Sequence, residues 1–146
     1  MKNSRRRARE YALQALYQWL INQSDAGTLL AQLREQKEFA RADQALAERL
    51  LRGVIADADG LRARLAPFLD RPVKELSPVE HALLLLAASE LRDHPETPYK
   101  VVINEAVELA KSFGGTDGHK YVNGVLDKLA TELRPEEIRA RRAQNT

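Results

Sequence analysis

Four arginines near the amino terminus are the residues of this sequence best suited to bind another molecule: Arg5, Arg6, Arg7 and Arg9. Arginine side chains donate to phosphate oxygens and stack on the faces of bases. Five cations and one glutamate give residues 1–10 a net charge of +4, whereas the whole chain carries only +2. This asymmetry favours a polyanionic partner, nucleic acid before a membrane surface, although a solvated basic tail would give the same charge. A smaller basic group follows at Arg139, Arg141 and Arg142.

Two tyrosines are positioned to offer such a partner a stacking surface. Tyr17 follows Arg6 by eleven residues, close to three helical turns, so both share one edge of a predicted helix, roughly 16 Å apart. Tyr121 shares an edge with Asp117 and Lys128 on the last predicted long helix, about 100° from the centre of its apolar face. Single-stranded RNA is commonly read by bases stacked on aromatic rings. The alternative is two tyrosines at the rim of the core with their hydroxyls in water.

Residue groups typical of catalysis are missing from the sequence. No histidine has a second one at metal-ligand spacing; the three are His81, His94 and His119. The glycine-rich run 114–118 lacks phosphate-loop spacing and follows a predicted helix rather than a strand. Glu105 and Glu108 lie three residues apart, but no Glu-x-x-His motif completes a di-iron site. With no cysteine, the chain also has no disulfide, thiolate metal site or cysteine nucleophile. We expect no enzyme activity, cofactor or metal.

Length and composition indicate one globular domain. The chain has 146 residues, of which 44% are hydrophobic and 30% charged, as is usual for a soluble protein. The longest purely apolar run, 82–88, is far shorter than the 18 or so residues of a membrane span. Glutamines and asparagines interrupt the first predicted helix and no cleavage site follows, so it does not read as a secretory signal. We therefore expect a cytoplasmic protein without membrane contact.

Helical periodicity dominates the chain, and strand alternation is nearly absent. The expected helices cover about 5–22, 28–37, 43–66, 78–92, 98–113 and 117–133. Ser77, Pro78 and Glu80 form a capping box that starts an almost wholly apolar helix, which belongs at the centre of a bundle. On the next helix the predicted buried face is Val102, Ala106, Leu109 and Phe113.

These elements predict an all-α fold, a compact bundle of about six to seven helices in one domain, 1–146. An N-terminal subdomain covers about 5–70, a C-terminal one about 76–134, and a basic polar tail, 135–146, is expected to fray. Gly53 and Gly60 are positions at which helix 43–66 is expected to bend or split. Gly124 lies inside the last long helix, where close helix packing explains a glycine more often than ligand approach.

Three motifs together resemble the NusB family of transcription antitermination factors. They read RRRARE at 5–10 followed by ALY at 15–17, PYKVVINEAVELAK at 98–111, and HKYVNGVLD at 119–127. Their order also matches, and the resemblance extends over about residues 5–134, although 24–42 and the tail after Leu133 match poorly.

The resemblance implies an all-helical bundle of two subdomains and a role without catalysis. Members of the family bind boxA, a short single-stranded RNA element of nascent ribosomal RNA transcripts. They do so with NusE, a small-subunit ribosomal protein, and the complex helps RNA polymerase and its other elongation factors resist premature termination. A free member can be a monomer or a homodimer.

The resemblance also assigns roles to particular residues. The implied RNA contacts are Arg5, Arg6, Arg7, Arg9, Tyr17, Lys100, Asp117, Lys120 and Tyr121. Tyr121 stands where some relatives have phenylalanine, which preserves a stacking face. Glu80 matches an acidic position that faces the protein partner.

Two other classes of function stay open at this point. A related fold is an accessory domain of some RNA cytosine methyltransferases, but that enzyme needs a large methyl-donor domain and a catalytic cysteine. The other class is a helical protein-interaction module whose basic arm never touches RNA. For that class, neutralising the arm would leave function intact.

Overall fold

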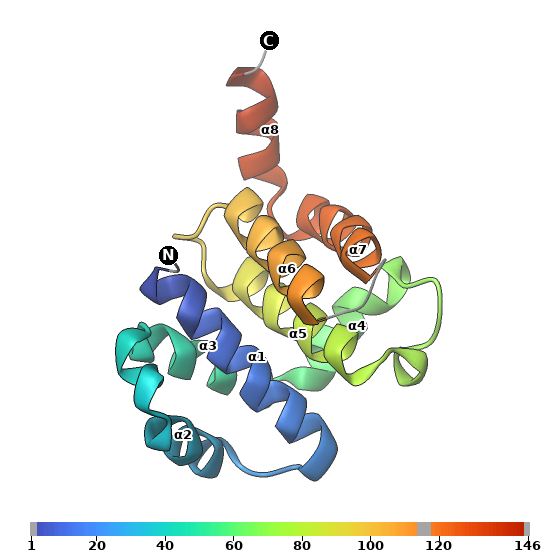
Figure 1. Cartoon of the computed structure of the whole chain (residues 1–146). Coiled ribbons are helices and arrows are strands. Elements are labelled where there is room, and N and C mark those ends of the chain that lie inside the picture. Colours follow the sequence, from blue (N-terminus) through green and yellow to red (C-terminus); the bar gives the residue numbers. More distant parts are fainter. Residues whose placement is uncertain (1–2, 114–117, 145–146) are drawn as a thin grey trace.

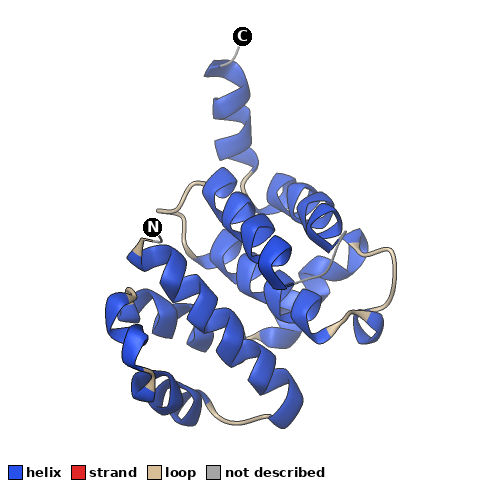
Figure 2. Ribbon diagram, viewed as in Figure 1, coloured by secondary structure: helices blue, strands red, loops and turns tan. Residues whose placement is uncertain are grey.

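The computed structural model describes residues 3–113 and 118–144, and within these ranges the chain forms helices and no strand (Figures 1 and 2). The α-helices are α1 (Ser4–Asn22), α2 (Ala26–Glu35), α3 (Gln44–Ala56), α4 (Ala58–Leu65), α5 (Pro78–Asp93), α6 (Tyr99–Phe113), α7 (Gly118–Leu133) and α8 (Pro135–Gln144). Short 3-10 turns cover Lys37–Arg41, Ala66–Phe68 and Val73–Glu75. The predicted all-α fold is confirmed.

Helix α5 lies at the centre of the bundle, as its apolar sequence predicts. The Ser77 side chain accepts from the Glu80 amide and Glu80 accepts from the Ser77 amide, so the predicted capping box is present. Every residue from Ala82 to Leu91 is buried. Helices α1, α3, α4, α6 and α7 all pack against α5. Because one continuous core joins both halves of the chain, the division into two subdomains near Leu76 stays a prediction.

Neither Gly53 nor Gly60 lies at the break in the predicted helix 43–66. The predicted helix 43–66 is two helices, and the break falls at Asp57, whose side chain accepts from the Gly60 amide and caps α4. Gly53 lies within unbroken α3, where a Cβ would come within 3.1 Å of the Ser89 hydroxyl of α5. The close-packing interpretation of Gly124 is wrong, since a Cβ there would meet nothing within 4 Å.

The predicted frayed tail is also wrong for residues 135–144, which form α8. This helix extends away from the rest of the bundle at the top of Figure 1. The buried Arg134 side chain holds its start, donating to the carbonyl oxygens of Leu91 at 2.7 Å, Thr97 at 3.0 Å and His94 at 2.9 Å. Pro135 suits the first helical position, and Ile138 is buried.

No helix within the described ranges has the length and apolar character needed to cross a membrane.

Candidate nucleic-acid interface

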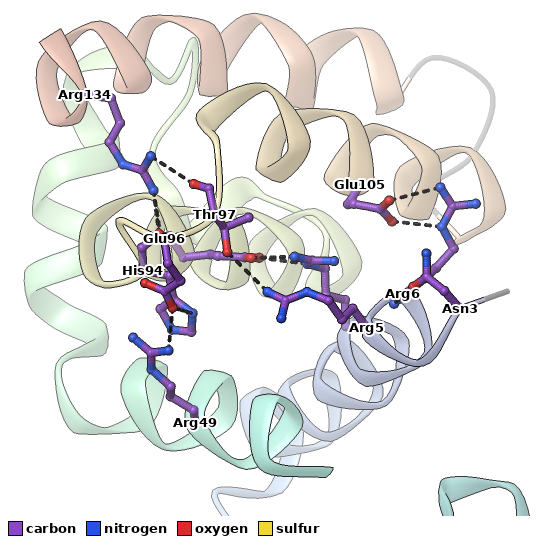
Figure 3. Close-up of polar contacts among 11 residues, drawn as sticks. Asn3, Arg5, Arg6, Arg49, His94, Glu96, Thr97, Glu105 and Arg134 are labelled. Atoms are coloured by element: carbon purple, nitrogen blue, oxygen red, sulfur yellow. Dashed lines mark hydrogen bonds and ion pairs between the residues drawn. The ribbon is translucent and has the colours of Figure 1, made fainter. Parts of the chain in front are cut away.

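Helix α1 presents Arg5, Arg6 and Arg7 at its first turns, and we call these three residues the arginine face. The helix starts there because the Asn3 side chain accepts from the Arg6 amide at 2.8 Å. Arg5 donates to the Thr97 hydroxyl at 3.3 Å, in the loop before α6 (Figure 3). Arg6 donates through Nε and Nη2 to Glu105 of α6, at 2.9 and 3.0 Å. Two of the three arginines, Arg5 and Arg6, are therefore held in place by side chains that lie about a hundred residues further along the chain.

The Arg6–Glu105 ion pair leaves the guanidinium accessible. The Arg6 side chain is 39% exposed, whereas that of Glu105 is 14% exposed. The hydrogen bonds and charge of Glu105 raise the pKa of Arg6. A phosphate that approaches Arg6 meets a correctly oriented cation and, behind it, a carboxylate that repels the phosphate.

Replacing Glu105 with glutamine is expected to raise RNA affinity about threefold, because removing a like charge some 6 Å from a phosphate near a wet surface is worth under 1 kcal/mol. Fluorescence anisotropy with a short single-stranded RNA measures the change. Glu48→Gln is the matched control, since the Glu48 carboxylate pairs with Arg34 and Arg52 rather than with the arginine face. A lower affinity for Glu105→Gln would show instead that the carboxylate mainly orients Arg6.

Arg7 and Tyr17 line one groove of about 490 Å³, which we call the aromatic groove. Phe113 from the end of α6 and Val79 from the start of α5 lie on its other side. Tyr17 is 40% exposed and Phe113 is 53% exposed. The prediction that Phe113 is buried is wrong: it is the last residue of α6, and its ring adds a second exposed aromatic surface beside Tyr17. Aromatic rings next to a cation are the arrangement that binds unpaired bases.

Arg9 does not reach the surface. It is only 4% exposed and donates to both carboxylate oxygens of Glu90 on α5, at 2.9 and 2.6 Å. Burial by itself lowers the pKa of Arg9, but the hydrogen bonds and charge of Glu90 outweigh it and the pKa is raised. The RNA contact that the resemblance implies for Arg9 does not fit this burial, and we assign Arg9 to the joint between α1 and α5.

Tyr121 already has a stacking partner, Arg71, which sequence reasoning missed. The Arg71 guanidinium lies 4.7 Å from the ring centroid, and the Tyr121 hydroxyl accepts from the Asp70 amide at 3.3 Å. Partial burial raises the pKa of Tyr121, and the bond from Arg71 lowers that of Asp70. Arg71 lies in a loop without periodicity, so no sequence pattern singles it out. A base at this position would stack beside Arg71 or displace it.

The other implied positions that the structure describes do not line the aromatic groove. Glu80 is half-buried, and its carboxylate accepts from the Ser77 amide in the α5 cap. Lys120 is exposed on α7, directly before Tyr121, and Lys100 is exposed at the start of α6. Asp117 lies outside the described residues. No cluster of metal-binding side chains occurs in the part of the chain that the structure describes.

Comparison with known proteins shows close similarity over nearly the whole chain. The model of the NusB family matches residues 6–131. A transcription antitermination protein NusB of Paraburkholderia phytofirmans is 58% identical over 142 residues, which is 97% of this chain and 99% of the relative. The one of Paraburkholderia phymatum is 59% identical over 140 residues, 96% of this chain and 97% of the relative.

Solved structures agree with this similarity. The structure of T. maritima NusB superposes with a TM-score of 0.81 at 30% identity, covering 95% of this chain and 99% of that one. A crystal structure of the antitermination factors NusB and NusE in complex with dsRNA matches with a TM-score of 0.74 at 22% identity, covering 87% of this chain and 96% of that one. At that identity the match concerns the fold alone.

Proposed function

The chain belongs to the NusB family, and from that premise we propose that it is a non-catalytic antitermination factor that binds single-stranded RNA together with NusE. The RNA is a boxA element of a nascent ribosomal RNA transcript. The bound complex joins the RNA polymerase elongation complex and helps it resist premature termination. This role places the protein in the cytoplasm with the transcription machinery, without cofactor or metal.

One observation carries the proposal: the arginine face leads directly into the aromatic groove. Arg7 belongs to both, and Tyr17 and Phe113 lie exposed in the same groove. Phosphates bind the cations and set a salt-dependent affinity, while unpaired bases stack on the rings. Lys100, Asp117, Lys120 and Tyr121 extend this surface in the proposal, and Arg9 does not.

The proposed NusE contact lies beside this surface, at Glu80. Val79 lines the aromatic groove, and Glu80 follows it at the start of α5. The Glu80 carboxylate lies near the start of α7, since a Cβ at Gly118 would come within 3.9 Å of it. We place NusE at Glu80, where it borders the bound RNA. Each ligand then enlarges the surface for the other, so the two bind with positive coupling, typically 5- to 150-fold.

Transcription in vitro tests the proposal. A template with a terminator, with and without an upstream boxA element, is transcribed by polymerase and the other elongation factors. Adding this protein with NusE is expected to raise read-through only where boxA is present. Equal read-through on both templates would refute the boxA role. A homodimer formed through the arginine face would block RNA binding there. Light scattering therefore first establishes the mass of the free protein.

The ring of Tyr121, more than its hydroxyl, is expected to matter for RNA. Tyr121→Ala should weaken binding about tenfold, since stacking is worth roughly 1–3 kcal/mol per base, whereas Tyr121→Phe should stay within about twofold. Anisotropy titrations measure both, and thermal melts check that both variants fold. Equal losses in the two variants would assign the effect to the hydroxyl and its bond from Asp70.

A further inference from the structure

A second groove, about 530 Å³ in size, lies between α6, α7 and α8, and we call it the α8 groove. Its lining residues are Tyr99, Lys100, Ile103, Asn104, Asn123, Asp127, Thr131, Ile138, Arg141 and Arg142. Neither the arginine face nor the aromatic groove contributes to it. Arg141 and Arg142 belong to the second basic group of the sequence, which the proposed function leaves without a role.

The charges of the α8 groove suit a phosphate chain. Three cations and one carboxylate line it. None of the described carboxylates lies within ion-pairing distance of Lys100, Arg141 or Arg142, whereas Arg139 on the same helix pairs with Glu136 at 2.6 Å. An anion can therefore bind these three cations without displacing a protein partner.

The remaining lining residues suit the ribose and the bases of RNA. Asn104 and Asn123 each offer a donor and an acceptor, whereas Thr131 offers an acceptor only, because its hydroxyl donates to the Lys128 carbonyl at 2.6 Å. The Asp127 carboxylate repels phosphate but accepts hydrogen bonds from a 2′-hydroxyl or an exocyclic amine. Tyr99 adds a half-buried ring. Such a mixed lining fits nucleotides better than it fits a run of acidic side chains, which Asp127 would only repel.

The α8 groove has a defined position relative to the arginine face. Glu137 of α8 accepts from the Tyr99 amide at 2.7 Å and so caps the start of α6. The Thr97 hydroxyl accepts from Arg5, and the Thr97 carbonyl accepts from Arg134, which holds the start of α8 (Figure 3). One residue thus joins the arginine face to the anchor of α8. Lys100, which lines the groove, follows Thr97 by three residues, so the loop before α6 lies between the arginine face and the α8 groove.

We propose that the α8 groove binds a single-stranded RNA segment that flanks the one held on the arginine face, with Lys100, Arg141 and Arg142 on its phosphates. This inference rests on the proposed function and adds α8 to the RNA-binding surface.

RNA length tests the inference. Wild-type protein is titrated with a short boxA-like RNA and with the same RNA extended by about 8 nucleotides on either side, a length within the usual range for one single-strand site. We expect one of the extensions to tighten binding about tenfold. We also expect that extension to steepen the dependence of log affinity on log salt by about 1.4, the value for the two phosphate contacts that Arg141 and Arg142 add to that of Lys100. Arg141→Gln with Arg142→Gln should remove most of this gain and leave the short RNA unaffected.

The matched control is Arg64→Gln with Arg139→Gln, which removes the same charge from exposed arginines outside the groove. It should keep the gain from the extension. The inference fails, and the proposed function stands, if wild type binds the short RNA but gains no affinity from either extension. The same conclusion follows if the control and the groove variant lose equal parts of that gain. If no RNA binds, the proposed function fails with the inference. A groove variant that keeps the full gain from the extension would also overturn the inference.

Discussion

Replacing Arg9 with methionine is expected to lower the free energy of unfolding by about 3–5 kcal/mol, because Glu90 is left charged in the core without its partner. The side chains of Arg9 and Glu90 are 5% and 2% exposed, and two hydrogen bonds join them. For a chain of this size that loss lowers the melting temperature by roughly 10 °C. Thermal and urea unfolding followed by circular dichroism measure both quantities.

The double variant Arg9→Met with Glu90→Leu distinguishes the cost of leaving Glu90 unpaired from the cost of changing the packing around Arg9. Replacing both charges by apolar groups of similar volume is often neutral for stability, so the double variant should be several kcal/mol more stable than Arg9→Met alone. It should also bind RNA as tightly as wild type, because Arg9 lies in the core. A double variant as unstable as the single one would contradict the ion-pair account, and a large loss of RNA affinity would return Arg9 to the interface.

Neutralising the arginine face is expected to weaken RNA binding about 100-fold near physiological salt, as three charge-assisted contacts to phosphate are lost. The variant is Arg5→Gln with Arg6→Gln and Arg7→Gln. The slope of log affinity against log salt should fall by about 2, the value for three single-strand phosphate contacts. Anisotropy titrations at several salt concentrations give both numbers.

A second triple variant controls for net charge. Arg34→Gln, Arg41→Gln and Arg52→Gln remove the same charge from arginines that are 57%, 70% and 53% exposed and pair with Glu48 or Glu38. Exposed pairs of this kind are worth about 0–1 kcal/mol, so the control variant should stay folded. Thermal melts check the fold of the arginine-face variant, in which Glu105, 14% exposed, loses Arg6. Equal losses of RNA affinity would show that net charge, not the arginine face, controls binding.

Local signals in the sequence predict the fold well. Ser77, Pro78 and Glu80 define the start of α5, and the apolar run that follows predicts its central position. The predictions fail where contacts between residues distant in the sequence determine where a helix begins or ends. Asp57 ends one helix and caps the next, which its sequence neighbours do not reveal. Helix α8 depends on Arg134, whose partners include the Leu91 and Thr97 carbonyls of other elements.

The candidate site is only partly predictable for the same reason. Arg9 and Arg6 are the same residue type, but Arg9 pairs with Glu90 in the core whereas Arg6 pairs with Glu105 at the surface. A signal was available, since Arg9 lies three and four residues before Ala12 and Leu13 on the apolar face of α1. Arg71 offers no such signal, because its contact with Tyr121 is made from an irregular loop.

A titration of boxA-like RNA, with and without NusE, at two salt concentrations tests the central claim most directly. A scrambled RNA of the same length is the reference. We predict tighter binding of the boxA-like RNA, about tenfold further strengthening by NusE, and weaker binding at the higher salt concentration. Equal affinity for both RNAs, with and without NusE, would contradict the account and leave the arginine face as a solvated basic surface on a protein-interaction module.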